Sequence, residues 1–277
     1  AECLPRIDVA IELVDARIPF SSKNPDIAKM TENKPKFIVL NKSDLSDPEQ
    51  NKKWLEYYKS TGYTAVLFDS KTKNRAAVSD IMKKITAVFS EKAQRNAEKG
   101  MRGRSLKIMV TGIPNVGKST FINCLCGKKL VKAEDRPGVT RGRQWISLGG
   151  GIDLLDMPGI LWPKLENQNS AKRLAMTGAI KDNVVDTEAL ACDLLAILRA
   201  HYEKNFRERY KLTGELPEDD YDLLGLIAKK RGLILSGGRP DEERASVMLL
   251  DEFRAAKLGR ITLDDIDQLA PILKNIE

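Results

Sequence analysis

Residues 112–119 read GIPNVGKS, which fits the pattern GxxxxGK[ST]. Loops of this kind cradle phosphate groups, because their glycines let backbone N–H groups approach an anion at the positive end of a helix. An apolar run at 106–110 predicts a strand before the loop, and residues 118–126 predict a helix after it. A phosphate-binding loop requires this strand–loop–helix context, so the stretch predicts an α/β fold built around it.

The side chains of this loop suggest separate tasks in holding a nucleotide. Lys118 is expected to bridge the β- and γ-phosphates, and the Ser119 hydroxyl is expected to ligate Mg²⁺. The carbonyl oxygen of Asn115 could coordinate a monovalent cation, and we hypothesise stimulation by K⁺. The residues of this stretch expected to contact the nucleotide are Asn115, Val116, Gly117, Lys118, Ser119 and Thr120.

A DMPG motif follows the phosphate loop and ends at Gly159, directly after the apolar segment IDLLD. Asp156 is expected to reach Mg²⁺ through water, and the Gly159 N–H is expected to sense the γ-phosphate. Between the two motifs, RPGVT places Thr140 where a switch threonine would ligate Mg²⁺, although the segment could be only a turn. The expected catalytic residues are Lys118, Thr140 and Gly159.

A guanine-reading tetrapeptide, NKSD, precedes both motifs in the chain, which reverses the usual order. Asp44 can accept two hydrogen bonds from guanine N1 and N2, a pattern that adenine does not offer. Asn41 would support the loop and meet the base edge, and the stem of Lys42 would lie over the ring. Ser70 follows the next predicted strand, where its backbone N–H could meet guanine O6. These motifs favour GTP over ATP.

No residue for orienting the attacking water is evident. Many GTPases place glutamine directly after DxxG, whereas this chain has Ile160 and Leu161 there. The single histidine, His201, lies in the C-terminal half and is expected in a core or surface role. We therefore predict slow intrinsic turnover that accelerates when a partner completes the site.

Strands alternating with helices in the first half predict a mostly parallel sheet covered on both faces. Helical spacing replaces the strand signal after residue 164, so we predict a GTPase domain at 1–164 and an all-helical domain at 165–277. The predicted strands are 7–14, 36–40, 64–68, 106–110, 145–148 and 152–155, and the predicted helices are 48–60, 78–98, 118–126, 168–181, 187–204, 217–231 and 241–258.

The net charge of +7 is uneven: residues 1–164 carry 29 Lys+Arg against 18 Asp+Glu, and residues 165–277 carry 17 against 21. The basic half favours a polyanionic partner, with RNA the leading candidate, although it is equally consistent with a solvated lysine-rich surface. The sequence contains no apolar run of about 18 residues, so no membrane span is expected. We expect a cytosolic chain, or an organellar one whose transit segment is missing.

The order NKSD, DSK, GIPNVGKST, PGVT, DMPG resembles that of circularly permuted GTPases. The segments LVDARIPFSSKNP, DRPGVT, DMPGILWPK and TGAIKD further resemble the YlqF/RbgA family of ribosome-assembly GTPases, over nearly the whole chain. The resemblance implies a factor, cytoplasmic in bacteria or in the mitochondrial matrix of a eukaryote, that binds a late large-subunit precursor and hydrolyses GTP. It also implies a helical C-terminal domain that contacts ribosomal RNA.

One departure from the family leaves two functions open. Family members carry a histidine in a short motif upstream of the first strand, and this histidine is proposed to act in hydrolysis. The sequence begins almost at that strand and contains no such histidine, so either the segment is missing from it or this member lacks the residue. The leading hypothesis is a monomeric GTPase switch, in which the Gly159 contact with GTP orients the helical domain for RNA docking. The alternative is a GTP-binding RNA-docking scaffold with little or no turnover.

Overall fold

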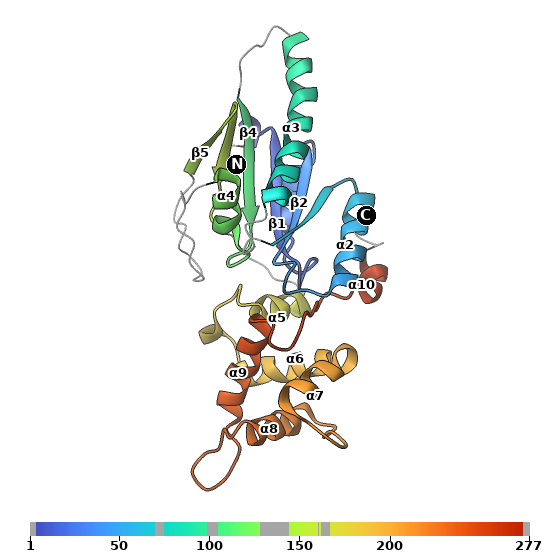
Figure 1. Ribbon diagram of the computed structural model, residues 1–277, viewed down its shortest axis with the longest axis vertical. Helices are drawn as coiled ribbons and strands as arrows, with labels where there is room; N and C mark the ends of the chain where they lie inside the picture. Colours follow the sequence, from blue (N-terminus) through green and yellow to red (C-terminus); the bar gives the residue numbers. More distant parts are fainter. Residues whose placement is uncertain are drawn as a thin grey trace.

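A computed structural model describes residues 4–69, 75–98, 105–127, 144–159, 161 and 167–273. The molecule is elongated, with an α/β half at one end and a helical half at the other (Figure 1). Six strands form one sheet in the order β3-β2-β1-β4-β6-β5, in which only the β5–β6 pair is antiparallel. The strands are β1 (Val9–Asp15), β2 (Lys36–Asn41), β3 (Thr64–Phe68), β4 (Leu106–Gly112), β5 (Gln144–Gly149) and β6 (Ile152–Asp156).

The sheet order explains how a rearranged sequence builds a single site. Strand β4, which leads into the phosphate loop, lies between β1 and β6 in the middle of the sheet, although it is fourth in the chain. Strand β2, which leads into NKSD, lies on the other side of β1. Since β1, β2 and β4 are parallel, their carboxyl ends meet at one edge, which faces the helical half (Figure 1). The predicted fold class is confirmed.

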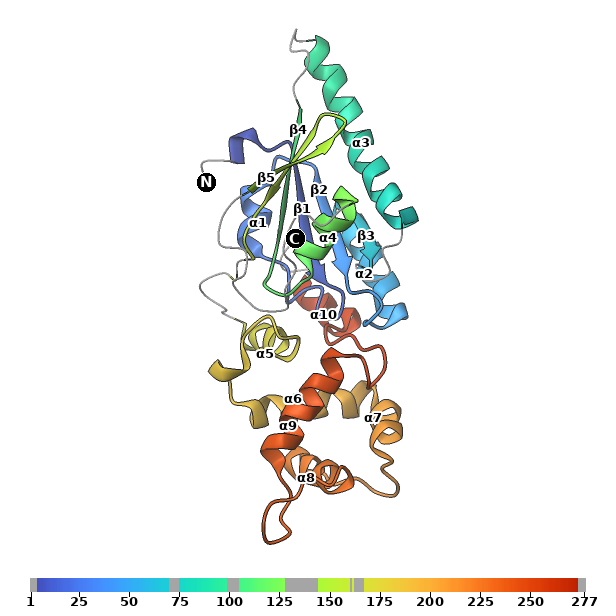
Figure 2. The same cartoon turned by 60° about the vertical axis from the view of Figure 1, so that its left-hand side comes forward.

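Helices cover both faces of the sheet, as the alternation of side chains along a strand requires (Figure 2). On one face Ile11 of β1 shares a core with Ile85 and Phe121, which lie on α3 (Arg75–Glu98) and α4 (Lys118–Cys126). On the other face Val14 shares a core with Trp54 of α2 (Pro48–Ser60) and Leu269 of α10 (Ile266–Leu273).

The boundaries of α2 follow directly from its sequence. Asp47 accepts a hydrogen bond from the backbone N–H of Glu49, and Pro48 occupies the first helical position. Gly62 follows with a φ of 84°, which ends the helix where the sequence predicted. The short helix α1 (Pro25–Met30) was missed, because its one turn and a half is too short to show periodicity.

The helical half is arranged around α6 (Thr187–His201), which packs against all four of its neighbours. These are α5 (Gln168–Met176), α7 (Glu203–Tyr210), α8 (Asp220–Lys230) and α9 (Glu242–Arg254), and the 3-10 turn Asp182–Val184 lies between α5 and α6. Several predicted helix bounds were wrong: 217–231 is observed as Asp220–Lys230, and 241–258 is observed as Glu242–Arg254. Helix α5 ends before Gly178, whose φ is 79°, and the predicted helix 187–204 is broken at Tyr202.

The chain returns from α9 to the α/β half, and the last helix, α10, packs against α2. Asp264 anchors this return: its fully buried carboxylate accepts hydrogen bonds from the Ser21 N–H and hydroxyl and from Arg173 of α5. Trp54 donates its indole N–H to the Asp264 carbonyl oxygen. The predicted division at residue 164 remains a prediction, and residues 261–273 lie against the α/β half.

Candidate nucleotide-binding site

The phosphate loop has the backbone geometry that its glycines predict. A Cβ atom on Gly112 would lie 2.8 Å from the carbonyl oxygen of Leu13, so only glycine fits between β4 and β1. Gly117 precedes α4 with a φ of 91°, and Asn115 also adopts a left-handed conformation with a φ of 58°. The loop therefore leads into the first turn of α4 in the arrangement that binds phosphates.

The DMPG segment lies directly against this loop. The Lys118 ammonium forms a salt bridge with the Asp156 carboxylate, and both side chains are buried. Asp156 Oδ2 is also buried and has no hydrogen-bond partner among the described residues. A Cβ atom on Gly159 would lie 3.1 Å from the Pro114 backbone, so the two segments touch main chain to main chain. A phosphate held in the loop would lie within reach of both motifs.

The NKSD turn is tied to the phosphate loop by a hydrogen bond across 75 residues of sequence. The Asn41 side-chain amide donates to the Val116 carbonyl oxygen at 2.7 Å, and Asn41 is fully buried. Lys42, whose φ is 60°, forms an ion pair with Asp15 at 3.1 Å. Because the turn and the loop are fixed to one another, base and phosphate contacts are held at a set spacing.

Asp15 and Arg17 support the turn from the end of β1. Both side chains are buried, and Arg17 donates to Asp15 Oδ1 from Nε and to Oδ2 from Nη2, at 2.9 Å and 2.7 Å. Burial raises the pKa of Asp15, but the charges of Arg17 and Lys42 outweigh burial and hold that pKa well below its usual value. Asp15 is therefore a fixed anion that orients the lysine of NKSD.

A cavity of about 480 Å³ joins these motifs, a volume within the range of ligand sites. The α/β half contributes both Asp44 of NKSD and Gly117 of the phosphate loop to its wall. The helical half contributes the segment 177–182, which connects α5 to the 3-10 turn. The lining residues are Arg17, Asn41, Lys42, Asp44, Leu45, Asp69, Asn115, Gly117, Thr120, Thr177, Gly178, Ile180, Lys181, Asp182 and Arg254.

The structure brings most of the predicted site residues to this cavity or beside it. Ser70 and Thr140 lie outside the described residues, as does Ile160, so their predicted roles have no structural counterpart here. Of the rest, the cavity is lined by Asn41, Lys42, Asp44, Asn115, Gly117 and Thr120, and adjoined by Val116, Lys118, Ser119, Asp156 and Gly159.

The sequence reasoning missed two parts of the site. Asp15 and Arg17 follow strand β1 at the sheet edge where NKSD lies, so their position was available as a signal. Segment 177–182, TGAIKD, carried a signal only through its resemblance to the family, and no role at the site was predicted for it. Arg254 lies at the end of α9 and had no signal. His201, expected in a core or surface role, is exposed and contacts Gln268 at 2.8 Å.

None of the helices in the described part of the chain has the length and apolar character needed to cross a membrane. A family model described as "50S ribosome-binding GTPase" matches residues 107–229. Ribosome biogenesis GTPase A of Bacillus cereus is 41% identical over 276 residues, spanning 100% of this chain and 92% of that protein. Mitochondrial ribosome-associated GTPase 1 of Ictalurus punctatus is 32% identical, spanning 94% of this chain and 86% of that protein.

Solved structures of similar chains share the fold over nearly its whole length. The GDP-bound structure of TM YlqF superposes with a TM-score of 0.68 at 26% identity, covering 96% of this chain and 98% of that one. The GNP-bound YlqF from T. maritima gives a TM-score of 0.64 at 26% identity, covering 96% and 97%.

Proposed function

The chain belongs to the ribosome biogenesis GTPase A (YlqF/RbgA) family, and from that premise we propose that it binds GTP and hydrolyses it during assembly of the large ribosomal subunit. One observation carries the proposal: Asp44 of NKSD and Gly117 of the phosphate loop line the same cavity. The base-reading and phosphate-binding elements are thus placed to hold one guanine nucleotide.

Each motif has a distinct role in holding that nucleotide. Asp44 accepts from guanine N1 and N2, Asn41 holds the turn against the loop, and Lys42 covers the ring with its aliphatic stem. The backbone N–H of Ser70 meets guanine O6. The phosphates are held by the loop residues Val116, Gly117, Lys118 and Thr120.

Magnesium fits the donors at the phosphate end. Asp156 Oδ2 is a buried carboxylate oxygen with no hydrogen-bond partner among the described residues, and such oxygens suit a hard divalent cation. We propose that Ser119 and Thr140 ligate the ion directly and that Asp156 does so through water. Bound magnesium would neutralise phosphate charge. Lys118 would then share its ammonium between Asp156 and a phosphate oxygen.

A monovalent cation is proposed at Asn115. Its side-chain NH₂ donates to the Gly178 carbonyl oxygen at 2.7 Å, which requires the amide oxygen to point elsewhere and leaves it as an acceptor. We expect phosphate release to be faster in K⁺ than in Na⁺. Equal rates of phosphate release in K⁺ and in Na⁺ would refute the proposed cation site.

The proposed turnover is slow without a partner. The Gly159 N–H lies on a segment in contact with the phosphate loop, and it would respond to the γ-phosphate. The large subunit would then complete the site and stimulate hydrolysis. Multiple-turnover phosphate release, measured with and without purified large subunits, tests this. If each protein molecule releases fewer than one phosphate under both conditions, the result would favour a docking scaffold instead.

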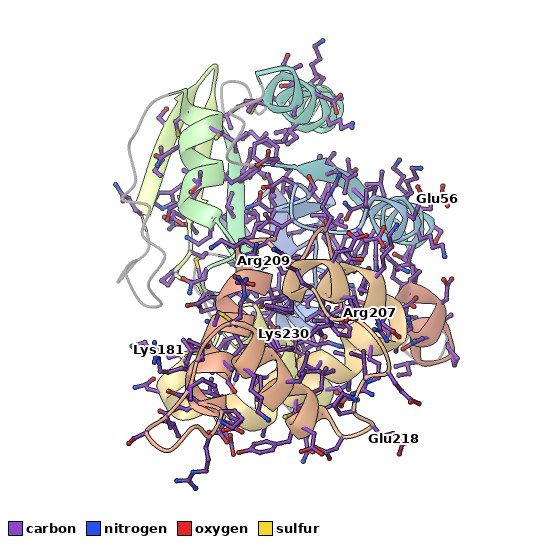
Figure 3. The ribbon with its side chains drawn as sticks, turned by 60° about the horizontal axis from the view of Figure 1, so that its bottom comes forward. Glu56, Lys181, Arg207, Arg209, Glu218 and Lys230 are labelled. Carbon is purple, nitrogen blue, oxygen red and sulfur yellow. The ribbon has the colours of Figure 1, made fainter. Side chains whose placement is uncertain are left out.

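RNA contacts are proposed for the exposed lysines of the helical domain, residues 165–277. The neighbouring arginines are engaged internally, because Glu252 holds both Arg209 and Arg231. Lys229 and Lys230 are exposed, and Figure 3 shows Lys230 in the middle of the helical end. Replacing both by glutamine should weaken large-subunit binding and reduce its salt dependence.

We propose that the protein acts as a monomer in the cytoplasm, or in the mitochondrial matrix of a eukaryote.

The experiment that tests the nucleotide assignment is Asp44→Asn. An asparagine cannot accept from both guanine N–H groups, so affinity for GTP should fall about 30-fold or more, on the order of 2 kcal/mol. Affinity for xanthosine triphosphate should rise, because xanthine offers a carbonyl where guanine has its amino group. Unchanged selectivity between the two nucleotides, measured by calorimetry, would refute the assignment.

A further inference from the structure

The helical half forms one wall of the nucleotide cavity. Besides residues of NKSD and the phosphate loop, the cavity is lined by five residues of the helical half: Thr177, Gly178, Ile180, Lys181 and Asp182. We propose that segment 177–182 contacts the bound nucleotide along its ribose side, with Lys181 as the charged contact and Arg254 as the residue that positions the segment. The inference rests on the proposed function and adds a third nucleotide-binding segment to it.

The segment is joined to the phosphate loop by a direct hydrogen bond. Asn115 of the loop donates its side-chain amide to the Gly178 carbonyl oxygen at 2.7 Å, across 63 residues of sequence. Both residues have left-handed backbones, with φ values of 58° and 79°. Two chain reversals therefore meet at this contact, which fixes the distance between the segment and the phosphates.

Arg254 holds the other side of the segment. Its guanidinium donates to the Ala175 and Met176 carbonyl oxygens at 2.9 Å and 3.0 Å, which satisfies the last carbonyls of α5. It also forms a salt bridge with Asp182 at 2.6 Å, at the far end of the segment. A Cβ atom on Gly178 would lie 3.5 Å from Arg254 Nε. One side chain thus spans the segment from start to end.

The same arginine is connected to the base-reading turn. Arg17 Nη1 donates to the Arg254 carbonyl oxygen at 3.4 Å, and its other nitrogens bind Asp15. Asp15 in turn pairs with Lys42 of NKSD. Polar contacts therefore run without interruption from Lys42, proposed to cover the base, through Asp15 and Arg17 to Arg254, which holds the segment.

The charge of the segment suits a nucleotide. Lys181 is exposed, and its ammonium makes no hydrogen bond or ion pair with the described residues, so it is available to an oxygen of the ligand. Figure 3 shows it at the edge of the helical half, apart from Arg207 and Lys230. Lys181 lines the same cavity as residues of NKSD and of the phosphate loop. Ribose hydroxyls and α-phosphate oxygens lie between base and terminal phosphate, so they are the groups that Lys181 would meet.

The arrangement has a mechanical consequence. A nucleotide that touches both NKSD and segment 177–182 ties the two halves of the molecule together at its ribose end. GDP and GTP share that end, so either nucleotide would restrain the helical half, and the γ-phosphate would only adjust its position.

The test compares Lys181→Ala and Arg254→Gln with matched controls. The controls are Lys204→Ala, an exposed lysine, and Arg244→Gln, an exposed arginine on the same helix as Arg254. Dissociation constants and dissociation rates of fluorescent GDP are measured at low and high salt, together with kcat at saturating GTP. We expect Lys181→Ala to weaken GDP binding five- to twentyfold, less at high salt. Arg254→Gln should speed GDP dissociation about tenfold, and in both variants kcat should change by a smaller factor than GDP affinity.

The controls should bind like the wild type. GDP affinity within twofold of wild type for Lys181→Ala would overturn the inference, whatever Arg254→Gln does, because the lysine is exposed and its loss leaves the core intact. A purely structural role of Arg254 would lower the melting temperature while leaving the GDP dissociation rate of the folded protein unchanged. If the wild-type protein binds no GDP, the proposed function fails. If it binds GDP and the variants match it, only the role of this segment fails.

Discussion

Glu12 is a carboxyl group buried in the central strand β1, and replacing it by glutamine should change how stability depends on pH. Its side chain is 4% exposed, and its Oε1 atom accepts a hydrogen bond from the Asn24 N–H at 2.7 Å. Burial raises the pKa of Glu12 to about 7, against the opposing effects of that hydrogen bond and of the Lys23 and Lys36 charges.

The raised pKa sets both the direction and the size of the effect. Between pH 4.5 and about 7 the folded chain keeps a proton on Glu12 that the unfolded chain releases. The stabilising contribution is therefore complete below pH 4.5 and is lost as pH rises through about 7. A pKa rise from 4.5 to about 7 corresponds to about 3 kcal/mol at ~1.4 kcal/mol per unit. Glutamine keeps the acceptor for Asn24 and does not ionise, so Glu12→Gln should be the more stable protein at pH 8.

Urea unfolding at pH 5, 6, 7 and 8 measures this difference. Relative to wild type, Glu12→Gln should gain about 2.5 kcal/mol in unfolding free energy between pH 5 and pH 8, because pH 5 already lies above the unfolded pKa of 4.5. Glu32→Gln is the matched control, because it removes the same charge at an exposed position. Parallel pH profiles for Glu12→Gln and wild type would refute the reasoning, since they would mean that Glu12 ionises equally in the folded and unfolded chain.

Three further substitutions test contacts that the structure places at the site and at the junction. Gly159→Ala puts a methyl group 3.1 Å from the Pro114 backbone and should lower kcat at least tenfold with GDP affinity little changed, measured by phosphate release and calorimetry. Asp264→Ala leaves Arg173 without its buried partner and should cost about 3 kcal/mol in urea unfolding. Glu252→Gln weakens the hold on two partly exposed arginines and should cost only about 1–2 kcal/mol, so a larger loss than for Asp264→Ala would contradict the burial argument.

Local signals predicted most of the α/β half correctly. The β-branched apolar runs became strands β1 to β4, and the Asp47–Pro48 pair began α2 at the predicted residue. Parallel strands bring their carboxyl ends to one edge of the sheet. Once the order of the strands is known, NKSD and the phosphate loop are therefore placed together. Two of the less accurate bounds in the helical half, those predicted at residues 181 and 204, arose where Gly178 and Tyr202 interrupt a continuous helical pattern.

The guanine and phosphate chemistry of this chain is carried by short motifs, because each motif works through its own backbone turn and a few adjacent side chains. The wall that the helical half contributes to the cavity contains TGAIKD, whose residue types do not indicate which group of a ligand they would contact. Gly178 meets Asn115 across 63 residues, and Arg17 meets Arg254 across 237. Such contacts exist only once α5 and α9 have packed against the sheet edge. Their partners are chosen by the geometry of the packed core, and neither local spacing nor residue type encodes that geometry.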